Sequence, residues 1–365
     1  MNKKILIVIA SIGGGGAERV AAQLSNYFSD QGHNVKVCYW NEAKNSYKIN
    51  SGVSLCKLNA KARVYTLSKT IKVFQPDVIL SFTDVSNVIA YYAKLLARSK
   101  AIYIPSIHND LKLRDSHIEI NLKNKGLDLF HRHVCKKSDK VVGVSEGAKN
   151  SFIKYYKVPP NKCCCIYNPI YIKPELKLRN LNEDKDSIKI VVAGRLTKQK
   201  NYPLLLDVAE KLKGLDFNFI IDIYGEGELR TQLEAQIQAK NLAARVNLKG
   251  FSKNLSTSLA NYDLFLMTSS WEGFGNVLVE ALENTLPIIS TDCPSGPREV
   301  LGNGEFGSLV PVNDSNAIVD LIVTGNYKKE FDLIKLKEHL SQFTLNSVGD
   351  KYLNLFNELY EQSND

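Results

Sequence analysis

Short apolar runs recur along the whole chain, and most of them are apolar throughout rather than at every second position. A strand with both faces buried has this composition, which is typical of a parallel sheet covered by helices on both sides. The alternation of such strands with helical segments predicts an α/β fold of doubly wound sheets. We expect strands at residues 4–10, 34–40, 77–82, 101–107, 140–145, 162–168, 188–194, 218–224, 245–249, 264–268 and 287–291.

A polar stretch near residues 168–187 divides these runs into two sets. A chain of 365 residues is long for one domain and comfortable for two. The simplest architecture is therefore two Rossmann-like, doubly wound domains that face each other across a deep cleft. The predicted boundaries are 1–170 for the first domain, 171–187 for a linker, 188–345 for the second domain and 346–365 for a C-terminal helix.

The chain has no window of eighteen apolar residues, so no transmembrane helix is predicted. The first apolar run, at residues 4–10, leads directly into glycines and charged residues without a small-residue cleavage site, which favours a buried strand over a signal peptide. The seven cysteines are odd in number. The adjacent Cys163, Cys164 and Cys165 alternate faces on a strand, so they cannot all bridge or bind one metal ion. We expect reduced thiols in a cytoplasmic protein.

Positive charge is concentrated in the first half of the chain. Residues 1–173 carry 27 Lys and Arg against 11 Asp and Glu, a net +16, and the remainder carries 20 against 27, a net −7. Nucleic acid is disfavoured as the partner because no base-reading motif accompanies the lysines. An anionic membrane surface fits better, at roughly 1 kcal/mol per well-placed cation. We expect a peripheral protein on the inner face of the cell membrane.

Two glutamates, Glu272 and Glu280, flank a Gly-Phe-Gly-Asn turn at residues 273–276. A pair of glutamates at this spacing occurs by chance in many charged helices, but the glycines imply a close approach of the backbone to a ligand. The turn lies after a predicted strand and before a predicted helix, where N–H groups and the helix dipole favour anions. Carboxylates accept hydrogen bonds from neighbouring hydroxyls, so a sugar and a ribose are natural ligands.

A glycine-rich turn at residues 13–16 follows the first predicted strand. The Rossmann dinucleotide fingerprint requires glycine at its first, third and sixth positions. Counted from Gly13 or Gly14, the sixth position is Glu18 or Arg19, so the fingerprint fails. The turn still places N–H groups at a helix start, where a phosphate can bind. A flexible turn without a ligand is the alternative.

The first strand of the second half ends at Gly194 and is followed by Arg195 and Lys200. A fork of donors and a point charge together suit a diphosphate. Such a pair is usually solvated surface, but its place after a strand indicates a phosphate site. The Asp-x-Asp stretch at residues 184–186 falls in the predicted linker, away from any strand end.

These motifs resemble those of the retaining nucleotide-sugar glycosyltransferases of family 4, in order and over nearly the whole chain. The resemblance implies the GT-B fold, with a C-terminal helix that crosses back onto the first domain. It implies that Arg195 and Lys200 neutralise the leaving nucleoside diphosphate, as a divalent metal does in other transferases. Residues 295–299 resemble a subgroup that acts on amino-sugar donors. The matching segments are residues 13–19, 194–201, 224–227, 249–251, 269–281 and 291–299.

The resemblance also implies roles for individual residues. Glu272 would orient the donor sugar and Glu280 the ribose, with no metal ion and no cofactor beside the UDP-sugar. The expected catalytic residues are Arg195, Lys200, Glu272 and His108. The expected donor-binding residues are Gly15, Gly16, Gly194, Gly225, Phe251, Gly273, Phe274, Gly275, Asn276, Val277 and Glu280.

His108 follows the predicted strand at residues 101–107. A lone histidine at a strand end is more often structural, but many family members carry a histidine or a Glu-Arg pair around this place. The resemblance therefore implies a contact with the C6 hydroxyl of the donor sugar. A role as base is not expected, because retaining transfer in this fold needs no protein nucleophile. His117, His131 and His133 have no recognisable partner spacing, and we interpret them as surface residues.

The segment 117–137 combines apolar and basic residues at helical spacing. It is either an ordinary surface helix or a basic amphipathic helix that lies in the bilayer interface and meets a lipid-linked diphosphate. The apolar residues predicted on one face are Ile118, Leu122, Leu129, Phe130 and Val134. The cations around them are Lys123, Lys125, Arg132, Lys136 and Lys137.

The sequence thus predicts a retaining, metal-independent transferase of a hexose or N-acetylhexosamine. The predicted donor is a UDP-sugar and the predicted acceptor a polyprenyl-diphosphate-linked sugar. A UDP-sugar epimerase of the same fold, which needs no acceptor, is one alternative, and a transferase acting on a soluble or protein acceptor is another. A non-catalytic membrane scaffold is disfavoured because both cations and both glutamates of the motifs are intact.

Overall fold

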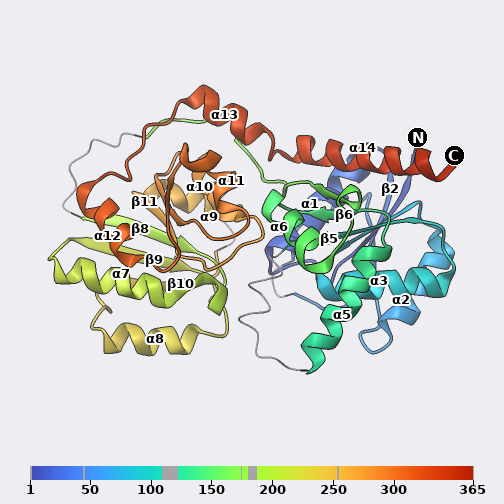
Figure 1. Ribbon diagram of the computed structural model, residues 1–365, viewed down its shortest axis with the longest axis horizontal. Coiled ribbons are helices and arrows are strands. Elements are labelled where there is room, and N and C mark those ends of the chain that lie inside the picture. Colours follow the sequence, from blue (N-terminus) through green and yellow to red (C-terminus); the bar gives the residue numbers. More distant parts are fainter. Residues whose placement is uncertain are drawn as a thin grey trace. The chain divides into compact units, whose positions relative to one another are not determined.

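The computed structural model describes residues 2–43, 46–108, 122–173, 175–179, 187–252 and 255–364. The chain folds into two compact units, one formed by Met1–Tyr171 with Gln342–Asp365 and the other by Ile172–Ser341 (Figure 1). His117, predicted as a surface residue, Ile118, predicted on the apolar face of the 117–137 segment, and the Asp-x-Asp stretch at 184–186 lie outside the described residues.

The first unit is built on a parallel sheet. Its described residues form seven strands in the order β3-β2-β1-β4-β5-β6-β7. The order reverses between β1 and β4, which is the arrangement of a doubly wound, Rossmann-like sheet. The strands are β1 Lys4–Val8, β2 Asn34–Tyr39, β3 Ser54–Lys57, β4 Val78–Phe82, β5 Ile102–Ile107, β6 Val141–Gly143 and β7 Cys163–Cys165.

Strand β1 shows why an unbroken apolar run predicts a sheet covered on both sides. Ile5 and Ile7 pack into a core with the helices on one face, whereas Leu6 and Val8 pack into a second core on the other. All four side chains are fully buried. Helices α1 Gly16–Asp30 and α14 Leu345–Asn364 cover the first face, and α2 Arg63–Phe74 and α3 Asp84–Ala97 the second. The other helices of this unit are α5 Leu122–Lys137 and α6 Glu146–Ser151, with short helical segments at Phe152–Tyr156 and Pro160–Lys162.

Helix α14 returns the chain to the first unit and packs against α1. The rings of Phe28 and Phe356 have their centroids 5.5 Å apart. Tyr27 donates a hydrogen bond of 2.5 Å to Asp350. A Cβ atom at Gly349 would lie 2.3 Å from the ring of Tyr27, so the absence of a side chain allows the two helices to approach this closely.

The second unit repeats the same plan. Its described residues form six parallel strands in the order β10-β9-β8-β11-β12-β13, and the order reverses between β8 and β11. The strands are β8 Ile188–Ala193, β9 Phe219–Tyr224, β10 Val246–Gly250, β11 Leu264–Met267, β12 Ile288–Thr291 and β13 Ser308–Val310. The helices are α7 Tyr202–Gly214, α8 Arg230–Ala239, α9 Leu255–Ser258, α10 Asn276–Glu283, α11 Pro297–Val300, α12 Ser315–Thr324 and α13 Leu333–Ser341, with 3-10 turns at Lys198–Lys200, Leu259–Asn261 and Gly302–Gly304.

The strands predicted from the apolar runs are all present, and two further strands escaped prediction. Strand β3 is mostly exposed at one edge of the first sheet, and β13 is a three-residue strand at one edge of the second. Edge position alone is not the reason, because the opposite edge strands β7 and β10 follow predicted runs. Strand β3 is mostly exposed and β13 has only three residues, the first a serine, so neither gives a long apolar run.

From Ile172 onward, the described part of the predicted linker belongs to the second unit. Arg179 donates from Nη2 to the carbonyl of Leu259 at 2.8 Å and from Nε to the carbonyl of Asn284 at 3.0 Å. The N–H of Lys173 donates to Glu283 Oε1 at 3.0 Å. These bonds hold the chain to the second unit well before β8 begins.

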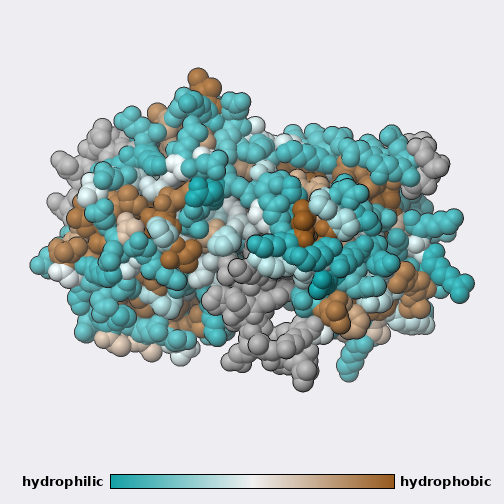
Figure 2. All heavy atoms as spheres, viewed as in Figure 1, coloured by the Kyte–Doolittle hydropathy of each residue, from teal (hydrophilic) through white to brown (hydrophobic). Residues whose placement is uncertain are grey.

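The surface seen in Figure 2 is mostly hydrophilic, with hydrophobic side chains gathered in patches. Within the described part of the chain, no helix is both long and apolar enough to cross a bilayer. All seven cysteines are free thiols. Cys163, Cys164 and Cys165 are half-buried on β7, and burial raises the pKa of Cys163 and Cys164 to about 11, which makes these thiols unreactive at neutral pH.

Candidate active site

The order of the second sheet reverses between β8 and β11, and the loops after these two strands carry the predicted motifs. In an open α/β sheet, ligands bind at the carboxyl ends of the strands where the order reverses. The loop after β8 contains Gly194, Arg195 and Lys200, and the loop after β11 contains Glu272 and the glycine turn. The topology brings together two motifs that lie 72 residues apart in the sequence.

Lys200 and Glu272 are paired with each other. Lys200 Nζ donates to Glu272 Oε1 at 2.5 Å, and Ser269 Oγ donates to the same oxygen at 2.7 Å. Gln199 Nε2 lies 3.4 Å from Glu272 Oε2 and donates to the carbonyl of Trp271 at 2.9 Å. The Lys200 side chain is 16% exposed and that of Glu272 only 7%. The predicted cation and the predicted carboxylate therefore neutralise each other largely out of water.

The burial of this pair makes each charge dependent on the other. Removing a charge from water is costly, and taking away one partner of a buried pair typically destabilises a protein by about 3–5 kcal/mol. The carboxylate acts on its surroundings as well. Burial raises the pKa of Tyr202 and of Cys293, and the negative charge of Glu272 raises both further.

Two predicted donor-binding glycines, Gly194 and Gly225, face atoms of the protein itself. A Cβ atom at Gly194 would lie 2.6 Å from Cε of Lys200, and one at Gly225 would lie 1.9 Å from the carbonyl oxygen of Gly194. Gly194 therefore leaves the space through which the Lys200 side chain runs to reach Glu272. Gly225 lets the end of β9 approach the end of β8. The missing side chains at these two positions therefore leave room for Lys200 and for the close approach of β8 and β9.

Two predicted site residues are open to solvent. Arg195 is exposed, and within the described part of the chain its side chain forms no ion pair. Phe251, just after β10, is 47% exposed. Both are accessible to a ligand without a rearrangement of the core.

The glycine turn leads into α10 and is mostly buried. Gly275 has φ +92° at the N-cap of the helix, a conformation that favours glycine. Phe274 is 2% exposed, so its ring is buried and is not open to a ligand. A Cβ atom at Gly296 would lie 2.2 Å from the carbonyl oxygen of Phe274, which shows how closely the next loop packs. Of the other predicted residues, Gly273 is buried, and Asn276 and Val277 are half-buried.

Glu280 lies in the second turn of α10 and is 6% exposed. One turn further on, Glu283 is 3% exposed and accepts hydrogen bonds from Ser256 Oγ and from the N–H of Lys173, both at 3.0 Å. Burial raises the pKa of Glu283. Nothing in the sequence distinguishes Glu283 from its neighbours, because its partners come from distant segments. It anchors the chain that precedes β8.

In the first unit, the predicted phosphate turn lies between β1 and α1. Gly15 is the N-cap of α1, and Gly16 is the first residue of this helix. The hydroxyl of Tyr47 donates to the carbonyl of Gly15 at 3.1 Å, and a Cβ atom at Gly15 would lie 2.2 Å from Glu18 Oε2. The turn is thus held from two sides at the carboxyl end of the sheet.

His108 is half-buried directly after β5. Its Nε2 lies 3.2 Å from Ser106 Oγ, and its ring packs on Phe82 with the centroids 5.5 Å apart. Burial lowers the pKa of His108 to about 4, although the Asp84 carboxylate acts in the opposite direction. The imidazole is therefore neutral at physiological pH. It offers a ligand a hydrogen bond rather than a positive charge.

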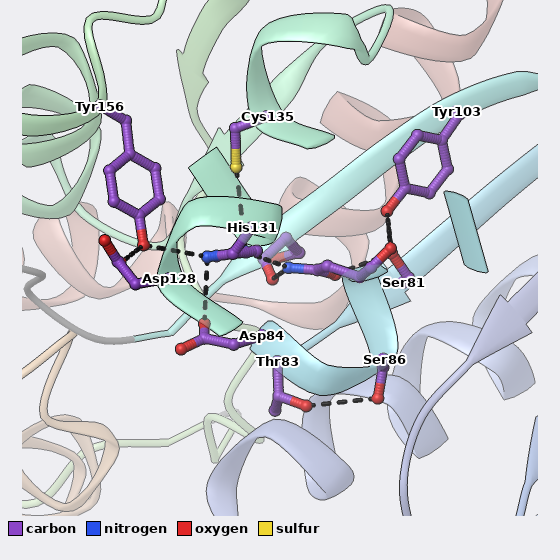
Figure 3. A network of polar contacts seen from close by, with 11 residues as sticks. Ser81, Thr83, Asp84, Ser86, Tyr103, Asp128, His131, Cys135 and Tyr156 are labelled. Carbon is purple, nitrogen blue, oxygen red and sulfur yellow. Dashed lines mark hydrogen bonds and ion pairs between the residues drawn. The ribbon is translucent and has the colours of Figure 1, made fainter. Parts of the chain in front are cut away.

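The prediction that His131 is a surface residue is wrong. Its side chain is fully buried on the inner side of α5, where Nε2 lies 3.1 Å from Asn87 Nδ2 and Nδ1 lies 3.3 Å from the hydroxyl of Tyr156 (Figure 3). These partners are 44 and 25 residues away, so no local spacing reveals them. His133, on the outer side of the same helix, is exposed as predicted.

The apolar stripe predicted for α5 is also wrong, because its residues lie on two sides of the helix. Val134 is fully buried, whereas Leu129 and Phe130 are 67% and 51% exposed. The neighbouring helix α3 exposes Leu95 and Leu96 by 53% and 52%. The apolar surface of this region is therefore shared by two helices.

Comparison with known families agrees with this site. A model of the family described as Glycosyltransferase Family 4 matches residues 14–173, and one described as Glycosyl transferases group 1 matches residues 175–324. A Campylobacter jejuni protein, N-acetylgalactosamine-N,N'-diacetylbacillosaminyl-diphospho-undecaprenol 4-alpha-N-acetylgalactosaminyltransferase, is 30% identical over 332 residues, which cover 87% of this chain and 88% of that protein. The chain belongs to glycosyltransferase family 4, and the protein is a glycosyltransferase.

Solved structures with a similar fold extend over nearly the whole chain. Sucrose-phosphate synthase from Thermosynechococcus elongatus has a TM-score of 0.80 at 14% identity and covers 99% of this chain and 100% of its own. Anabaena HepE in complex with UDP and glucose has a TM-score of 0.77 at 18% identity, with coverages of 98% and 100%. The two parallel-sheet domains confirm the predicted GT-B fold.

Proposed function

We propose that the protein transfers a hexose or N-acetylhexosamine from a UDP-sugar to a polyprenyl-diphosphate-linked sugar, with retention of configuration and without a metal ion. The observation that supports this most is the group formed by Lys200, Glu272 and the exposed Arg195 where the order of the second sheet reverses. The loop that carries Glu272 leads into the N-terminus of α10. The group supplies positive charge for a diphosphate and a carboxylate for sugar hydroxyls.

The proposed chemistry follows from these charges. The bond between the anomeric carbon and the β-phosphate oxygen breaks, and its electron pair passes to the diphosphate. Arg195, Lys200 and the first N–H groups of α10 stabilise this charge as it develops. The acceptor oxygen bonds to the anomeric carbon on the same face, and its proton passes to the departing phosphate oxygen. The configuration is retained without a protein nucleophile.

The ion pair prepares the site for its donor. Lys200 Nζ donates to Glu272, and an ammonium group has three donors, so a phosphate oxygen can bind to it while the carboxylate stays in place. Glu272 is thereby held where a sugar hydroxyl can donate to it. Glu280, on α10, would take the ribose hydroxyls in the same way.

The choice of substrates is supported by relatives. The Campylobacter jejuni relative that is 30% identical is named for transfer to an undecaprenol-diphosphate-linked sugar. A second protein of that organism, 24% identical over 98% of this chain and 99% of its own length, is named as an alpha-1,4-N-acetyl-D-galactosaminyltransferase that acts on a PP-undecaprenol-linked saccharide. These names favour a lipid-linked acceptor and an amino-sugar donor.

A donor screen tests the proposal. Purified protein is incubated with UDP-glucose, UDP-galactose, UDP-N-acetylglucosamine or UDP-N-acetylgalactosamine and a polyprenyl-diphosphate-linked N-acetylhexosamine, and the products are analysed by mass spectrometry and anomeric NMR. We expect the addition of one sugar with the anomeric configuration of the donor. Epimerised UDP-sugar in the absence of an acceptor would favour the epimerase alternative. Transfer only to free sugars or peptides would favour the other alternative acceptor class.

We further propose that α3 and α5 dock the protein on an anionic membrane. Leu95 and Leu96 of α3 and Leu129 and Phe130 of α5 are each more than half exposed, and Phe130 contacts Tyr92 across the two helices with ring centroids 6.1 Å apart. Exposed apolar groups beside cations are typical of a surface that meets lipid. The cations carried by these helices and the residues just after α3 include Lys94, Arg98, Lys100, Arg132, Lys136 and Lys137.

Vesicle co-sedimentation tests this surface. Binding to anionic vesicles is expected at low salt and should weaken at high salt, because the Debye length falls from about 30 Å at 0.01 M to about 3 Å at 1 M. A variant with Leu129→Ser and Phe130→Ser should bind less, whereas Leu215→Ser, at a 61% exposed position of the second unit, should not. Neutralising Lys123, Lys125, Arg132, Lys136 and Lys137 together should reduce vesicle binding without changing UDP-sugar affinity. Equal binding of all variants, or equal binding to neutral vesicles, would contradict the docking surface.

A further inference from the structure

The first sheet also has a point at which its order reverses, between β1 and β4. The glycine turn follows β1, and Thr83 and Asp84 follow β4. Thr83 has φ +73° and ψ +155°, a conformation that is rare for a β-branched residue. Asp84 is the first residue of α3. A carboxylate thus follows a strained residue at the edge where ligands of such sheets bind.

Asp84 lies next to a buried hydrogen-bond network around His131, and the hydrogen-bond partners fix the positions of its protons (Figure 3). The carbonyl of Ser106 can only accept, so the amide atom of Asn87 that lies 3.4 Å from it is the donor Nδ2. The same Nδ2 lies 3.1 Å from His131 Nε2, which must then accept. The imidazole is therefore neutral and carries its proton on Nδ1.

The Nδ1 proton points to the side of the ring where Asp84 lies. Nδ1 is 3.3 Å from the hydroxyl of Tyr156, within hydrogen-bond distance, and 3.7 Å from Asp84 Oδ1, too far for a hydrogen bond, so the N–H acts on this carboxylate through its dipole. Tyr156 donates its own proton to Asp128, so its oxygen can accept from the histidine. The opposite side of Asn87 is fixed as well, because Ser81 Oγ donates to its Oδ1 at 2.7 Å. These hydrogen bonds fix the side-chain orientations of Asn87, His131 and Tyr156.

His131 and Asp84 differ in their exposure to solvent. The His131 side chain is 1% exposed, whereas that of Asp84 is 22% exposed. The histidine therefore cannot meet a substrate, but the carboxylate can. His108 is the other histidine at this edge of the sheet. The negative charge of Asp84 raises its pKa, but burial has the larger effect and lowers the pKa to about 4, so His108 is neutral. Asp84 thus adds a hydrogen-bond acceptor beside a neutral imidazole.

We propose that Asp84 accepts a hydrogen bond from a hydroxyl of the acceptor sugar, and that His131 is a positioning residue that holds the Asp84 carboxylate in place. This inference rests on the proposed function and adds a residue for the acceptor substrate. A carboxylate suits a hydroxyl because it accepts strongly and donates nothing. It repels phosphate groups, so the part of the acceptor that suits it is the hydroxyl-bearing sugar and not the diphosphate.

The test compares two isosteric substitutions at the two ends of β4. Asp84→Asn keeps the shape of the side chain and removes its charge. Asp77→Asn is the matched control, because Asp77 precedes β4 and accepts a hydrogen bond from the N–H of Lys4 at 2.7 Å, which an amide oxygen can still accept. Transfer is measured with the best donor of the UDP-sugar screen and a polyprenyl-diphosphate-linked N-acetylhexosamine. UDP-sugar affinity is measured by calorimetry.

We expect Asp84→Asn to lower kcat/KM for the acceptor by roughly 10- to 100-fold, the range of a hydrogen bond to a charged group. UDP-sugar affinity should be unchanged, and Asp77→Asn should behave as the wild type. Wild-type acceptor kinetics in Asp84→Asn, or a lowered thermal midpoint with unchanged acceptor kinetics, would overturn the proposal. The wild-type transfer reaction, measured first, tests the proposed function separately.

Two substitutions of His131 test its role, because each one replaces a different nitrogen of the imidazole ring. The amide nitrogen of Asn takes the place of Nδ1, and that of Gln takes the place of Nε2. His131→Asn should therefore keep the acceptor KM closer to the wild-type value than His131→Gln does. The reverse order, or equal acceptor KM values, would overturn the positioning role.

Discussion

The two sheets have the same reversal of strand order, but the edges at which they reverse differ in charge. In the second unit, an ammonium and a carboxylate are paired 2.5 Å apart, and the exposed Arg195 lies in the same loop as the ammonium. In the first unit, the neutral His108 and the neutral His131 lie near the carboxylate of Asp84. One topology thus supports a cationic site in one unit and a hydrogen-bonding site in the other.

This difference shows that topology fixes where a site lies and the side chains decide what it binds. A departing diphosphate requires positive charge, and the second unit supplies it from Arg195 and Lys200. A sugar hydroxyl requires an oriented acceptor, and the first unit supplies one in Asp84. If this is right, Lys200 and Glu272 stabilise each other strongly, and Arg195 acts on the reaction without contributing to stability.

The largest effect is expected for the buried pair. Lys200→Met leaves the Glu272 carboxylate without its cation, and Glu272→Gln leaves the ammonium without its anion. Each change should lower the free energy of unfolding of the second unit by about 3–5 kcal/mol. The double variant should lose less than the sum, because neither charge is then left alone. Urea unfolding followed by circular dichroism measures all three.

The same unit offers a control for this prediction. Lys240 and Glu210 form a pair of 2.6 Å whose side chains are 37% and 49% exposed. Such an exposed pair contributes about 0.2–1 kcal/mol, so Lys240→Met should change stability little. Single variants of the buried pair that are as stable as the wild type, or strictly additive losses, would contradict the coupling.

Arg195 should affect catalysis and leave stability unchanged. Its side chain is exposed, so Arg195→Ala removes no buried contact. Loss of one group that stabilises developing charge typically slows kcat by about 10²- to 10³-fold, or about 3–4 kcal/mol. Arg230→Ala, which removes a half-buried arginine paired with Glu226 and Glu234, serves as the control and should keep the wild-type kcat. A wild-type rate in Arg195→Ala would remove the proposed diphosphate site.

The fold was largely predictable because its signal is local. An inner strand of a parallel sheet is mostly apolar, as in residues 5–8 of β1 and 78–80 of β4, so each such strand could be identified from its own residues. The edge strands β3 and β13 lack this signal. The place of the motifs at strand ends followed from the same pattern, since a turn after an apolar run falls at the carboxyl edge of the sheet.

The partners of the site residues could not be predicted, because they depend on contacts between distant segments. The sequence marked Lys200 and Glu272 as separate groups for a ligand, and only the adjacency of β8 and β11 shows that they bind each other. His131 was misassigned for the same reason, since Asn87 and Tyr156 come from other elements. A histidine whose partners are far away in the sequence has no local pattern.

A smaller effect is expected from the neutral histidine of the first unit. Burial lowers the pKa of His108 from 6.5 to about 4 in the folded protein. Between these values the unfolded chain binds a proton that the folded chain does not, so stability falls as the pH decreases from about 6.5 to about 4 and changes no further below that through this group. The free energy of unfolding of His108→Gln should therefore decrease less between pH 7 and pH 5 than that of the wild type. His133→Gln, at an exposed position, should decrease as much as the wild type. Urea unfolding near pH 7 and near pH 5 measures it, and identical pH dependence in all three proteins would contradict the buried neutral state.

The central claim is that protein cations, rather than a metal ion, stabilise the leaving diphosphate during retaining transfer. It is tested most directly by following one transfer reaction by NMR in the presence of EDTA. The account predicts that the product forms at the rate seen without chelator and keeps the anomeric configuration of the donor. Loss of transfer in EDTA with recovery on adding Mg²⁺ or Mn²⁺, or a product of inverted configuration, would contradict it.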